Sequence, residues 1–497
     1  MADVHKPVHA GTRWALIHGS YEAVERFAVN ELQRTLQRHL PYVMEVRPGA
    51  DEAARRERHL VLTGTAGANP LLGELVSRGL LRAPEGVGGY SLAVMDSPWG
   101  AGRKLLAVCG SDPAGVLHGV VDFSARVLTA RVAPDDPREL RRALDEMAPL
   151  TLSEGPAVAN RGLWTWGYVV YDYRRYIDNM ARLKMNMLCL WNDCAPENAA
   201  EIVAYAHSRG IKVVWGFHWG WGIEGLDLAD REHRRLTREQ VLRTYREEYA
   251  GLGGDGIYFQ TATEHKQLEL GGRSVASLAC DWVNDIAGAL LDVDPGLYIQ
   301  FGLHAISIGE HCRDLASLDP RVSLVWEDAG AVPYSYDPAE DFAATPWYVP
   351  PELNTAAKTL EYSRRLAALR PGAEFGMVAK GWMKLRWGVD FEHHGRFVLG
   401  ERDRAWIRRR LEERRPGWDR VNRQWLRGFP AAARFYRETL DCRPAGMTVL
   451  GLVEDGMFEE EIQPSVALFA ETLWNPRRPD AELLDLAMSP YYREARS

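Results

Sequence analysis

From about residue 157 the sequence repeats one pattern, in which a short apolar segment is followed by a longer amphipathic one. The apolar segments have the length and composition of strands and cover 161–170, 185–191, 213–219, 256–261, 298–303, 322–326, 376–381 and 447–452. Helical patterns separate them, and a further one at 466–474 follows the last strand. Strands such as NMLCLW and KVVWGF are apolar throughout, which is typical of parallel strands buried on both faces. Strands and helices that alternate in this way predict a TIM (β/α)8 barrel.

The first 130 residues have a different pattern, which predicts a small α/β domain. Strand patterns cover 14–18, 42–47, 59–63, 90–95 and 104–109, and helical patterns cover 22–40, 71–77 and 112–128. Residues 131–156 begin with a polar stretch that contains Pro134 and Pro137. We therefore expect an accessory α/β domain at 1–130, a linker at 131–156 and a catalytic barrel at 157–497. A doubly wound sheet is the alternative fold, but no GxGxxG turn follows the first strand of either domain.

Charge and composition narrow the range of partners. The formal net charge is −8, so there is no overall basic field that would attract nucleic acid. No stretch reaches about 18 apolar residues, so we expect no membrane-spanning helix. Residues 1–11 lack the apolar run of a signal peptide, and we expect a cytoplasmic protein. The six cysteines contain no CxxC pair, and we expect them to be buried thiols. The sequence is compatible with a monomer or a homo-oligomer.

Tryptophan is frequent in this chain, at 17 of 497 residues, and nine of the 17 lie in or directly after the predicted barrel strands. Functional side chains of such barrels lie at the C-terminal ends of the strands. Indole rings there can stack on the C–H faces of a sugar, while polar neighbours bind its hydroxyl groups. Barrel packing is the alternative explanation for each single tryptophan. The candidate substrate-binding residues are Trp164, Trp166, Trp191, Asn192, Asp193, His218, Trp219, His265, His304, Tyr334, Lys380 and Trp382.

Three carboxylates at strand ends predict the chemistry. Glu264 follows the fourth strand in YFQTATEHK, and Glu327 and Asp328 end the sixth in LVWEDAG. Strands four and six are near neighbours around a barrel, so these groups can face one another across a cleft. Glycosidic cleavage needs one protonated carboxyl group as acid and one ionised carboxylate as base or nucleophile. A salt bridge or a helix cap is the alternative role for any one of them.

Other catalytic chemistries have weaker support. His218, His265 and His304 could join carboxylates in a metal site, but the sequence has neither an HxH nor an HExxH pattern. No GxSxG segment marks a serine nucleophile. We therefore expect no metal and no cofactor.

Segments of the first domain and of the barrel resemble known glycosidases. The segment GGYSLAVMDSPWGAGRKLLAVCGSDPAGVLHGVVDFSARVL at 88–128 is similar to the accessory domain that precedes the barrel in bacterial β-N-acetylhexosaminidases and α-glucuronidases. The segments GGDGIYFQTATEHKQ and GGRSVASLACDWVNDIAGAL resemble the strand-four region of α-glucuronidases, and RGLWTWG and IKVVWGFHWGWG resemble their first and third strands. The resemblance implies that Glu264 is the general acid and that Glu327 or Asp328 is the base or nucleophile. Thr263 precedes Glu264, where hexosaminidases have an aspartate, and this weakens a substrate-assisted mechanism.

The function that these features predict is an exo-acting glycoside hydrolase, similar to α-glucuronidases, that removes a terminal sugar from an oligosaccharide or glycoside. Lys380 is then a candidate partner for the carboxylate of an acidic sugar. A β-N-acetylhexosaminidase-like enzyme is one alternative, and a barrel that binds carbohydrate without cleaving it is another.

Overall fold

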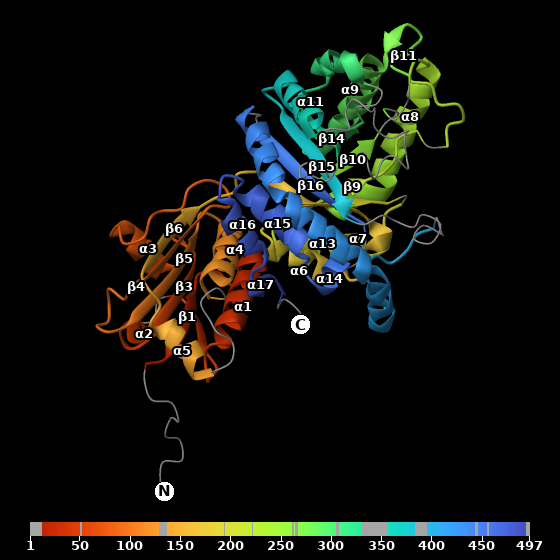
Figure 1. Ribbon diagram of the computed structural model, residues 1–497. Helices are drawn as coiled ribbons and strands as arrows, with labels where there is room; N and C mark the ends of the chain where they lie inside the picture. The colour runs from red at the N-terminus through yellow and green to blue at the C-terminus, as the bar shows by residue number, and fades with distance from the viewer. Residues whose placement is uncertain are drawn as a thin grey trace. The chain divides into compact units, whose positions relative to one another are not determined.

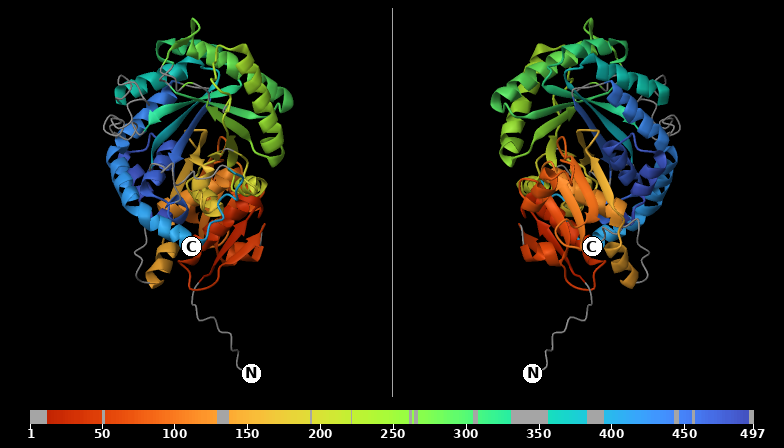
Figure 2. Two further views of the ribbon diagram at one scale, coloured as in Figure 1. Left: turned by 90° about the vertical axis from the view of Figure 1, so that its right-hand side faces the viewer. Right: turned by 90° about the vertical axis from the view of Figure 1, so that its left-hand side faces the viewer.

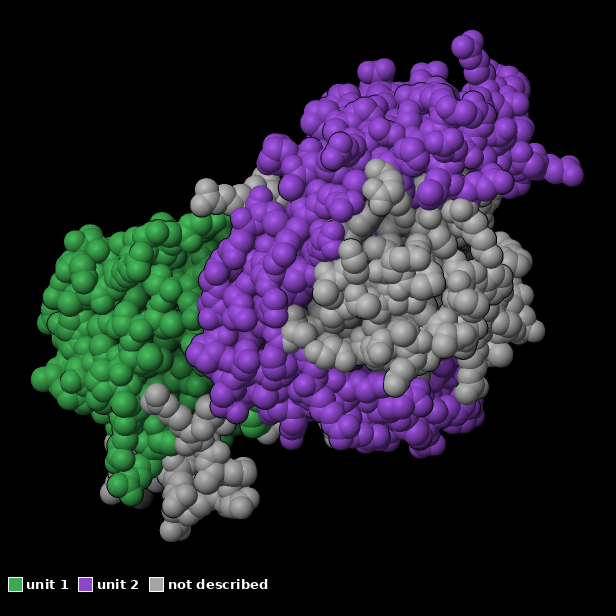
Figure 3. All heavy atoms as spheres, turned by 45° about the horizontal axis from the view of Figure 1, so that its top comes forward, with its two compact units in different colours: residues 1–156, 489–491 green, residues 157–488, 492–497 purple. Residues whose placement is uncertain are grey.

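The computed structural model describes residues 12–49, 52–128, 137–192, 194–220, 222–260, 263, 267–304, 308–330, 356–382, 395–442, 446–454 and 457–493 (Figure 1). The chain divides into two compact units, coloured separately in Figure 3. Unit 1 consists of residues 1–156 and 489–491, and unit 2 consists of residues 157–488 and 492–497.

Unit 1 is built around a six-stranded sheet with the order β2-β1-β3-β5-β4-β6. Four strands are parallel, namely β1 (Trp14–His18), β2 (Glu45–Pro48), β3 (His59–Thr65) and β5 (Lys104–Gly110). Two run antiparallel to their neighbours, namely β4 (Tyr90–Asp96) and β6 (Leu150–Glu154). The helical segments are α1 (Ala23–Gln37), α2 (Glu52–Glu57), α3 (Pro70–Ser77), α4 (Pro113–Asp122), the π-helix η1 (Phe123–Leu128) and α5 (Pro137–Asp145).

Local sequence signals explain where two of these helices begin. The Asn69 side chain accepts a hydrogen bond from the backbone N–H of Leu71, and proline occupies the first turn of α3. Asp112 accepts from the backbone N–H of Gly115 in the same way at the start of α4, where Pro113 follows it. A capping side chain followed by proline satisfies or removes backbone donors that a helix start leaves unpaired.

The extent of unit 1 differs from the predicted domain boundaries. The sequence predicts a linker at 131–156, but α5 and β6 lie in this segment, and β6 pairs with β4 through Leu152 and Leu92. An edge strand of a sheet needs only one neighbour, so the short segment LTLSE completes the sheet. Residues 489–491 also belong to unit 1: Ser489 Oγ donates to the carbonyl of Ala125, and the Tyr491 hydroxyl to Glu31.

Unit 2 is a closed barrel of eight parallel strands, and the predicted TIM-barrel fold is confirmed. In chain order the strands are β7 (Asn160–Trp166), β8 (Met187–Trp191), β9 (Lys212–Gly216), β10 (Gly256–Gln260), β13 (Tyr298–Leu303), β14 (Val322–Gly330), β15 (Glu374–Trp382) and β16 (Gly446–Val453). Each of the eight predicted segments overlaps one of them. Pairing of β16 with β7, and of β9 with β10, leaves no free edge in the barrel.

Helices surround these strands (Figure 2). They are α6 (Tyr173–Arg182), α7 (Ala199–His207), α8 (Arg231–Thr244), α9 (Val275–Val293), α11 (Ala356–Leu369), α13 (Arg404–Asp441), α14 (Met457–Glu460), α15 (Pro464–Trp474) and α16 (Asp480–Ala487). The π-helix η4 (Tyr245–Tyr249) continues α8, and the short helix α17 spans Pro490–Arg493. Within the described ranges, we find no helix with the length and apolar character needed to cross a membrane.

The interior of the barrel is filled largely by one cluster of side chains. Its buried members are Trp164, Met187, Cys189, Trp191, Val214, Tyr258, Val325, Val378, Leu450 and Leu452. Together with the adjoining Tyr298, they come from all eight strands. Within a strand these residues are two apart, so alternate positions face the inside, as the pleat of a strand requires. The alternation therefore indicates which residues at the strand ends can reach the barrel axis.

A buried group of charges stabilises the barrel away from this cluster. Lys184, in the turn before β8, lies with Nζ 2.9 Å from Oε1 of Glu471 in α15. Arg478 lies 2.9 Å from the other oxygen of the same carboxylate. The hydroxyl of Tyr492 donates to Glu471 as well, at 2.5 Å. A buried charge must be paired in this way, because its desolvation is otherwise too costly.

Candidate active site

The candidate site is centred on Glu327, near the C-terminal end of β14. Glu327 is two residues from Val325 in β14, so its side chain faces the barrel interior, as the Val325 side chain does. Glu327 is 3% exposed. A carboxylate so deeply buried requires partners, and the neighbouring strands provide them.

Both oxygens of Glu327 have such partners. Oε1 accepts hydrogen bonds from the hydroxyl of Tyr258 and, at 2.5 Å, from Nε2 of Gln260, both on β10. Oε2 lies 3.3 Å from Nε2 of His304, directly after β13, and 3.4 Å from Nζ of Lys380 on β15. The side chains of strands four, five, six and seven therefore converge on one carboxylate.

The charge state of Glu327 follows from these neighbours. Burial by itself raises the pKa of Glu327, but the charges of Lys380 and His304 and the hydrogen bond from Tyr258 lower it more. The pKa of this carboxyl therefore lies well below its ordinary value. Burial and the nearby carboxylate raise the pKa of Tyr258, so its hydroxyl stays protonated and can donate. Glu327 is thus an ionised group at neutral pH and is unsuited to act as an acid.

Gly302 makes this arrangement possible. It lies on β13, between the strands that carry Tyr258 and Glu327. A Cβ atom at position 302 would collide with both the Tyr258 hydroxyl and Oε1 of Glu327. The absence of a side chain at this position therefore lets the two groups approach each other.

Aromatic rings extend from Tyr258 toward strands one and two. The rings of Trp164 and Trp166 meet edge to face at 5.0 Å, and Trp164 stacks on Trp191 at 5.9 Å between centroids. Trp164 also contacts the Tyr258 ring, at 5.9 Å. Trp164 and Trp191 are buried, whereas Trp166 at the end of β7 is half-buried. Trp166 therefore presents the accessible aromatic surface of this group.

The structure brings together six of the predicted site residues: Glu327, His304, Lys380, Trp164, Trp166 and Trp191. Asn192 directly follows β8, and His218 lies two residues after the end of β9, at the same end of the barrel. Asn192 is fully buried, and in the described part of the chain neither polar atom of its side chain has a hydrogen-bond partner. Asp193, Glu264, His265, Tyr334 and the side chain of Asp328 lie outside the described residues.

Two predicted substrate-binding residues lie elsewhere, and this is a correction. Trp219 stacks on Phe259. Phe259 is adjacent to the inward-facing Tyr258 in β10, so its side chain points to the outer face of the strand. Trp382 stacks on Trp425 of α13 at 3.7 Å, and its indole N–H donates to Ser465 of α15. Both rings are buried against the outer face of the barrel strands. The pairing of β15 with its neighbour shifts register between Ala379 and Trp382, so Trp382 no longer shares the inward direction of Lys380.

Tyr258, Gln260 and Gly302 are not among the site residues that the sequence predicts. The segment GIYFQ does contain a signal, because Tyr258 and Gln260 are two apart at the C-terminal end of a strand and so face the same side. Their common target on β14 follows only from the barrel. Within the described ranges, no group of three or more His, Cys, Asp or Glu residues is arranged to bind a metal.

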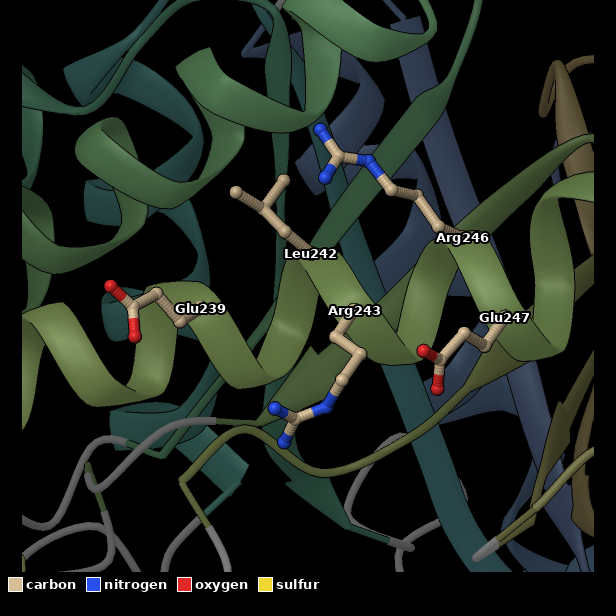
Figure 4. Close-up of a pocket in the computed structure, with 5 residues that line it drawn as sticks. All are labelled: Glu239, Leu242, Arg243, Arg246 and Glu247. Carbon is tan, nitrogen blue, oxygen red and sulfur yellow. The ribbon is translucent and has the colours of Figure 1, made fainter.

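A pocket on the surface of α8 and η4 is separate from this site (Figure 4). It is lined by Glu239, Leu242, Arg243, Arg246 and Glu247. The lining comes from one continuous helical segment and carries as many carboxylates as guanidinium groups. It therefore has no net charge that would select a ligand.

This protein is similar to known proteins in fold but not in sequence. No family model matches this sequence, and no curated protein matches it. A GH138 enzyme targeting pectin rhamnogalacturonan II has a TM-score of 0.53 and 12% identity, over 95% of this chain and 65% of its own. The structure of CpGH84B has a TM-score of 0.50 and 10% identity, over 95% of this chain and 70% of its own. A GH20 exo-β-N-acetylglucosaminidase from Vibrio harveyi, in complex with N-acetylglucosamine, has a TM-score of 0.47 and 11% identity, over 95% and 72%.

The first two likenesses show that the chain has a fold found in glycoside hydrolases. This chain spans less than two thirds of the length of the GH138 enzyme. A barrel fold by itself hosts many chemistries, so the activity must be argued from the site.

Proposed function

We propose that this protein is an exo-acting glycoside hydrolase in which Glu327 is the ionised catalytic carboxylate. The observation that carries the proposal is the buried Glu327, which Tyr258, Gln260, His304 and Lys380 surround at the C-terminal end of the barrel. This is the end at which active sites of such barrels lie. Cleavage of a glycosidic bond by a pair of carboxyl groups needs one of them ionised, either as nucleophile at the anomeric carbon or as base toward the attacking water.

The other roles in the proposal come from the sequence. Glu264 follows β10, the strand that carries Tyr258 and Gln260, and is proposed as the general acid that protonates the leaving oxygen. Asp328 is the alternative to Glu327 as base or nucleophile. Trp166 is proposed as the surface on which the sugar ring stacks, with Trp164 and Trp191 behind it. Asn192 and His218 are proposed to bind sugar hydroxyl groups.

The resemblance of residues 253–267 to α-glucuronidases supports a uronic acid as the terminal sugar. A substrate panel tests this directly with aryl glycosides of α-glucuronic acid, β-N-acetylhexosamines and common neutral sugars. Hydrolysis of an N-acetylhexosaminide alone would assign the alternative specificity. Binding of sugars without turnover of any glycoside or natural disaccharide would refute the enzymatic function.

The role of Glu327 is tested by Glu327→Gln. Glu374→Gln is a matched control, because Glu374 also lies on a barrel strand but at its first residue, where it accepts from Tyr298 and Asn160. We expect Glu327→Gln to lower kcat by about 10²–10⁴-fold, and Glu374→Gln to retain kcat in the fraction that folds. Near wild-type turnover by Glu327→Gln would contradict the assignment.

A further inference from the structure

We propose that α13 carries a second carbohydrate-binding site, outside the barrel, where an acidic polysaccharide binds along a row of exposed arginine side chains. This surface, the arginine face, consists of Trp406 and six arginines of α13: Arg408, Arg409, Arg415, Arg420, Arg423 and Arg427. The site is separate from the proposed catalytic centre, and only the choice of a carbohydrate as its ligand rests on the proposed function.

Positive charge is concentrated on the first part of α13. Residues 404–427 contain nine arginines and three carboxylates, whereas the whole chain has a formal net charge of −8. A concentration of one sign of charge on one surface raises the local density of oppositely charged ligands. A guanidinium group also binds a carboxylate through two parallel hydrogen bonds, which a lysine ammonium group cannot do. The segment is therefore suited to a ligand that carries several carboxylates.

The six arginines of the face are exposed, and in the described ranges none of them has a carboxylate partner. Of the three carboxylates among residues 404–427, Glu413 is already paired with Arg410, at 3.3 Å. By contrast Arg434, further along the same helix, lies 2.6 Å from Glu438. An anionic ligand can therefore bind the arginine face without displacing a carboxylate of the chain.

The arginines lie on the side of α13 that faces away from the barrel (Figure 1). Buried residues of this helix recur at intervals of three, four or seven, which places them along one face: Ile407, Leu411, Trp418, Val421 and Trp425. With 3.6 residues per turn, the six arginines fall on the opposite side. Between Arg408 and Arg427 the face is about 30 Å long, at 1.5 Å per residue. A ligand that contacts all of it must be extended, as a linear polysaccharide is.

Trp406 provides a surface for a sugar ring at one end of this face. It is 37% exposed, the most of any tryptophan in the described ranges. Its ring meets that of the buried Tyr171 edge to face, at 4.9 Å between centroids, and the guanidinium carbon of Arg402 lies 5.9 Å from its centroid. Tyr171 therefore holds the indole in one orientation. An exposed indole beside guanidinium groups matches a uronic acid unit, whose C–H face stacks and whose carboxylate pairs.

A nucleic acid is the other linear polyanion that could fit such a face. Proteins that bind single strands stack successive bases on several aromatic rings. All the other aromatic side chains of α13 are buried, so Trp406 alone is available for stacking on this helix. A polymer of uronic acids needs only one such ring, because its other units bind through their carboxylates. The observations therefore favour an acidic polysaccharide.

The arginine face begins near the catalytic end of the barrel. α13 follows β15, the strand that carries Lys380, and the segments that follow barrel strands start at that end. Just before α13, the backbone N–H of Arg402 donates to the carbonyl of Tyr171, in the loop after β7. A polysaccharide bound along the face therefore has one end near the proposed catalytic site, and the protein can hold a long substrate at two sites.

The experiment measures binding of a long oligogalacturonate to the full-length protein by titration calorimetry at low ionic strength. We expect binding that weakens as salt is added. The fully methyl-esterified oligomer, which has the same backbone without the charges, should bind at least about 10-fold more weakly. Arg408→Gln/Arg409→Gln should weaken binding of the acid by roughly 5–30-fold. The matched control, Arg231→Gln/Arg243→Gln, removes two exposed arginines from α8 and should have no effect.

Trp406→Ala keeps every charge and tests the contact with the sugar ring. It should weaken binding of the oligogalacturonate by roughly 3–10-fold. Binding of polyglutamate should stay unchanged in this variant, because polyglutamate has carboxylates but no sugar ring. Unchanged binding of the oligogalacturonate, or equal losses for both polymers, would overturn the assignment of a carbohydrate ligand.

Four other results would overturn the inference: no binding of the oligogalacturonate to the wild type, equal binding of its methyl ester, equal losses in the α13 and α8 double variants, or binding of a single-stranded RNA homopolymer as tight as that of the oligogalacturonate. Binding at equilibrium requires no turnover, so failure of the proposed hydrolase activity is a separate result. If no glycoside is hydrolysed but binding at α13 behaves as expected, only the catalytic proposal is refuted.

Discussion

Replacement of Lys380 by methionine should move the acidic limb of the pH–activity profile upward. Nζ of Lys380 lies 3.4 Å from Oε2 of Glu327. Two unit charges at this separation interact by about 1 kcal/mol at the dielectric constant of water and about 5 kcal/mol at an effective value of 20. Because the lysine side chain is 26% exposed, we take the lower half of this range, about 1–3 kcal/mol. This corresponds to a rise of roughly 1–2 units in the pKa of Glu327.

In the proposed reaction Glu327 acts as a carboxylate. The carboxylate must be ionised, and its lowered pKa keeps it so in the wild type even under mildly acidic conditions. When Lys380 is removed the pKa rises, so activity is lost at a higher pH as the solution is acidified. At pH 7 Glu327 stays ionised in both proteins, and any remaining difference in kcat/KM there reports altered orientation or leaving-group ability.

The assay is kcat/KM for an aryl glycoside, measured as initial rates after brief pH jumps over a range that extends from neutral pH down to about pH 2, where the limb of the variant should separate from that of the wild type. The acidic limb of this parameter reports groups of the free enzyme. Lys380→Arg is the matched control, because it keeps the charge and should leave the limb close to that of the wild type. Superimposable acidic limbs for Lys380→Met and wild type would refute the view that Lys380 holds Glu327 ionised.

Three further predictions concern packing around and away from the site. Gly302→Ala should separate Tyr258 from Glu327, because the added Cβ would collide with both groups. Loss of a hydrogen bond to a charged group costs about 1.5–3 kcal/mol, so kcat/KM should fall by roughly 10–100-fold. Gly288→Ala in α9 is the control and should leave kcat/KM unchanged, because a Cβ there meets no atom within 4 Å. Trp382→Ala should lower the free energy of unfolding in urea by about 3–5 kcal/mol. Trp406→Ala is the control and should cost about 0.5 kcal/mol, because the Trp406 side chain is 37% exposed. Equal losses for the two variants would argue against the buried position of Trp382. Lys184→Met should cost about 3–5 kcal/mol in the same measurement, because it leaves Glu471 with one fewer cation, and a loss below about 1 kcal/mol would contradict this.

Much of the barrel could be predicted from the sequence because the relevant signals are local. A parallel strand buried on both faces must be apolar along most of its length, and segments such as MLCLW and the first four residues of GIYFQ meet this condition. Their alternation with helical patterns then leaves few arrangements. Unit 1 was less predictable at its end, since β6 is recognisable as a strand only once β4 offers it an edge.

The sequence also pointed to three groups of the candidate site. Glu327, His304 and Lys380 lie at the ends of strands, and a barrel places all such ends on one face. Trp219 and Trp382 satisfy the same rule and yet pack on the outer face. Position along a strand is a local property, whereas the direction of a side chain depends on pairing register, and a shift such as that before Trp382 leaves no clear mark in the sequence.

By itself, then, the sequence determined the order of strands and helices, the end of the barrel where chemistry belongs and the residue types available there. Only the tertiary structure decided that Tyr258 and Gln260 hold one oxygen of Glu327 while Lys380 and His304 flank the other. The physical reason is that the charge state of a buried carboxylate depends on groups a few ångströms away in space. Here those groups come from three other strands, and Gly302 contributes by having no side chain at all.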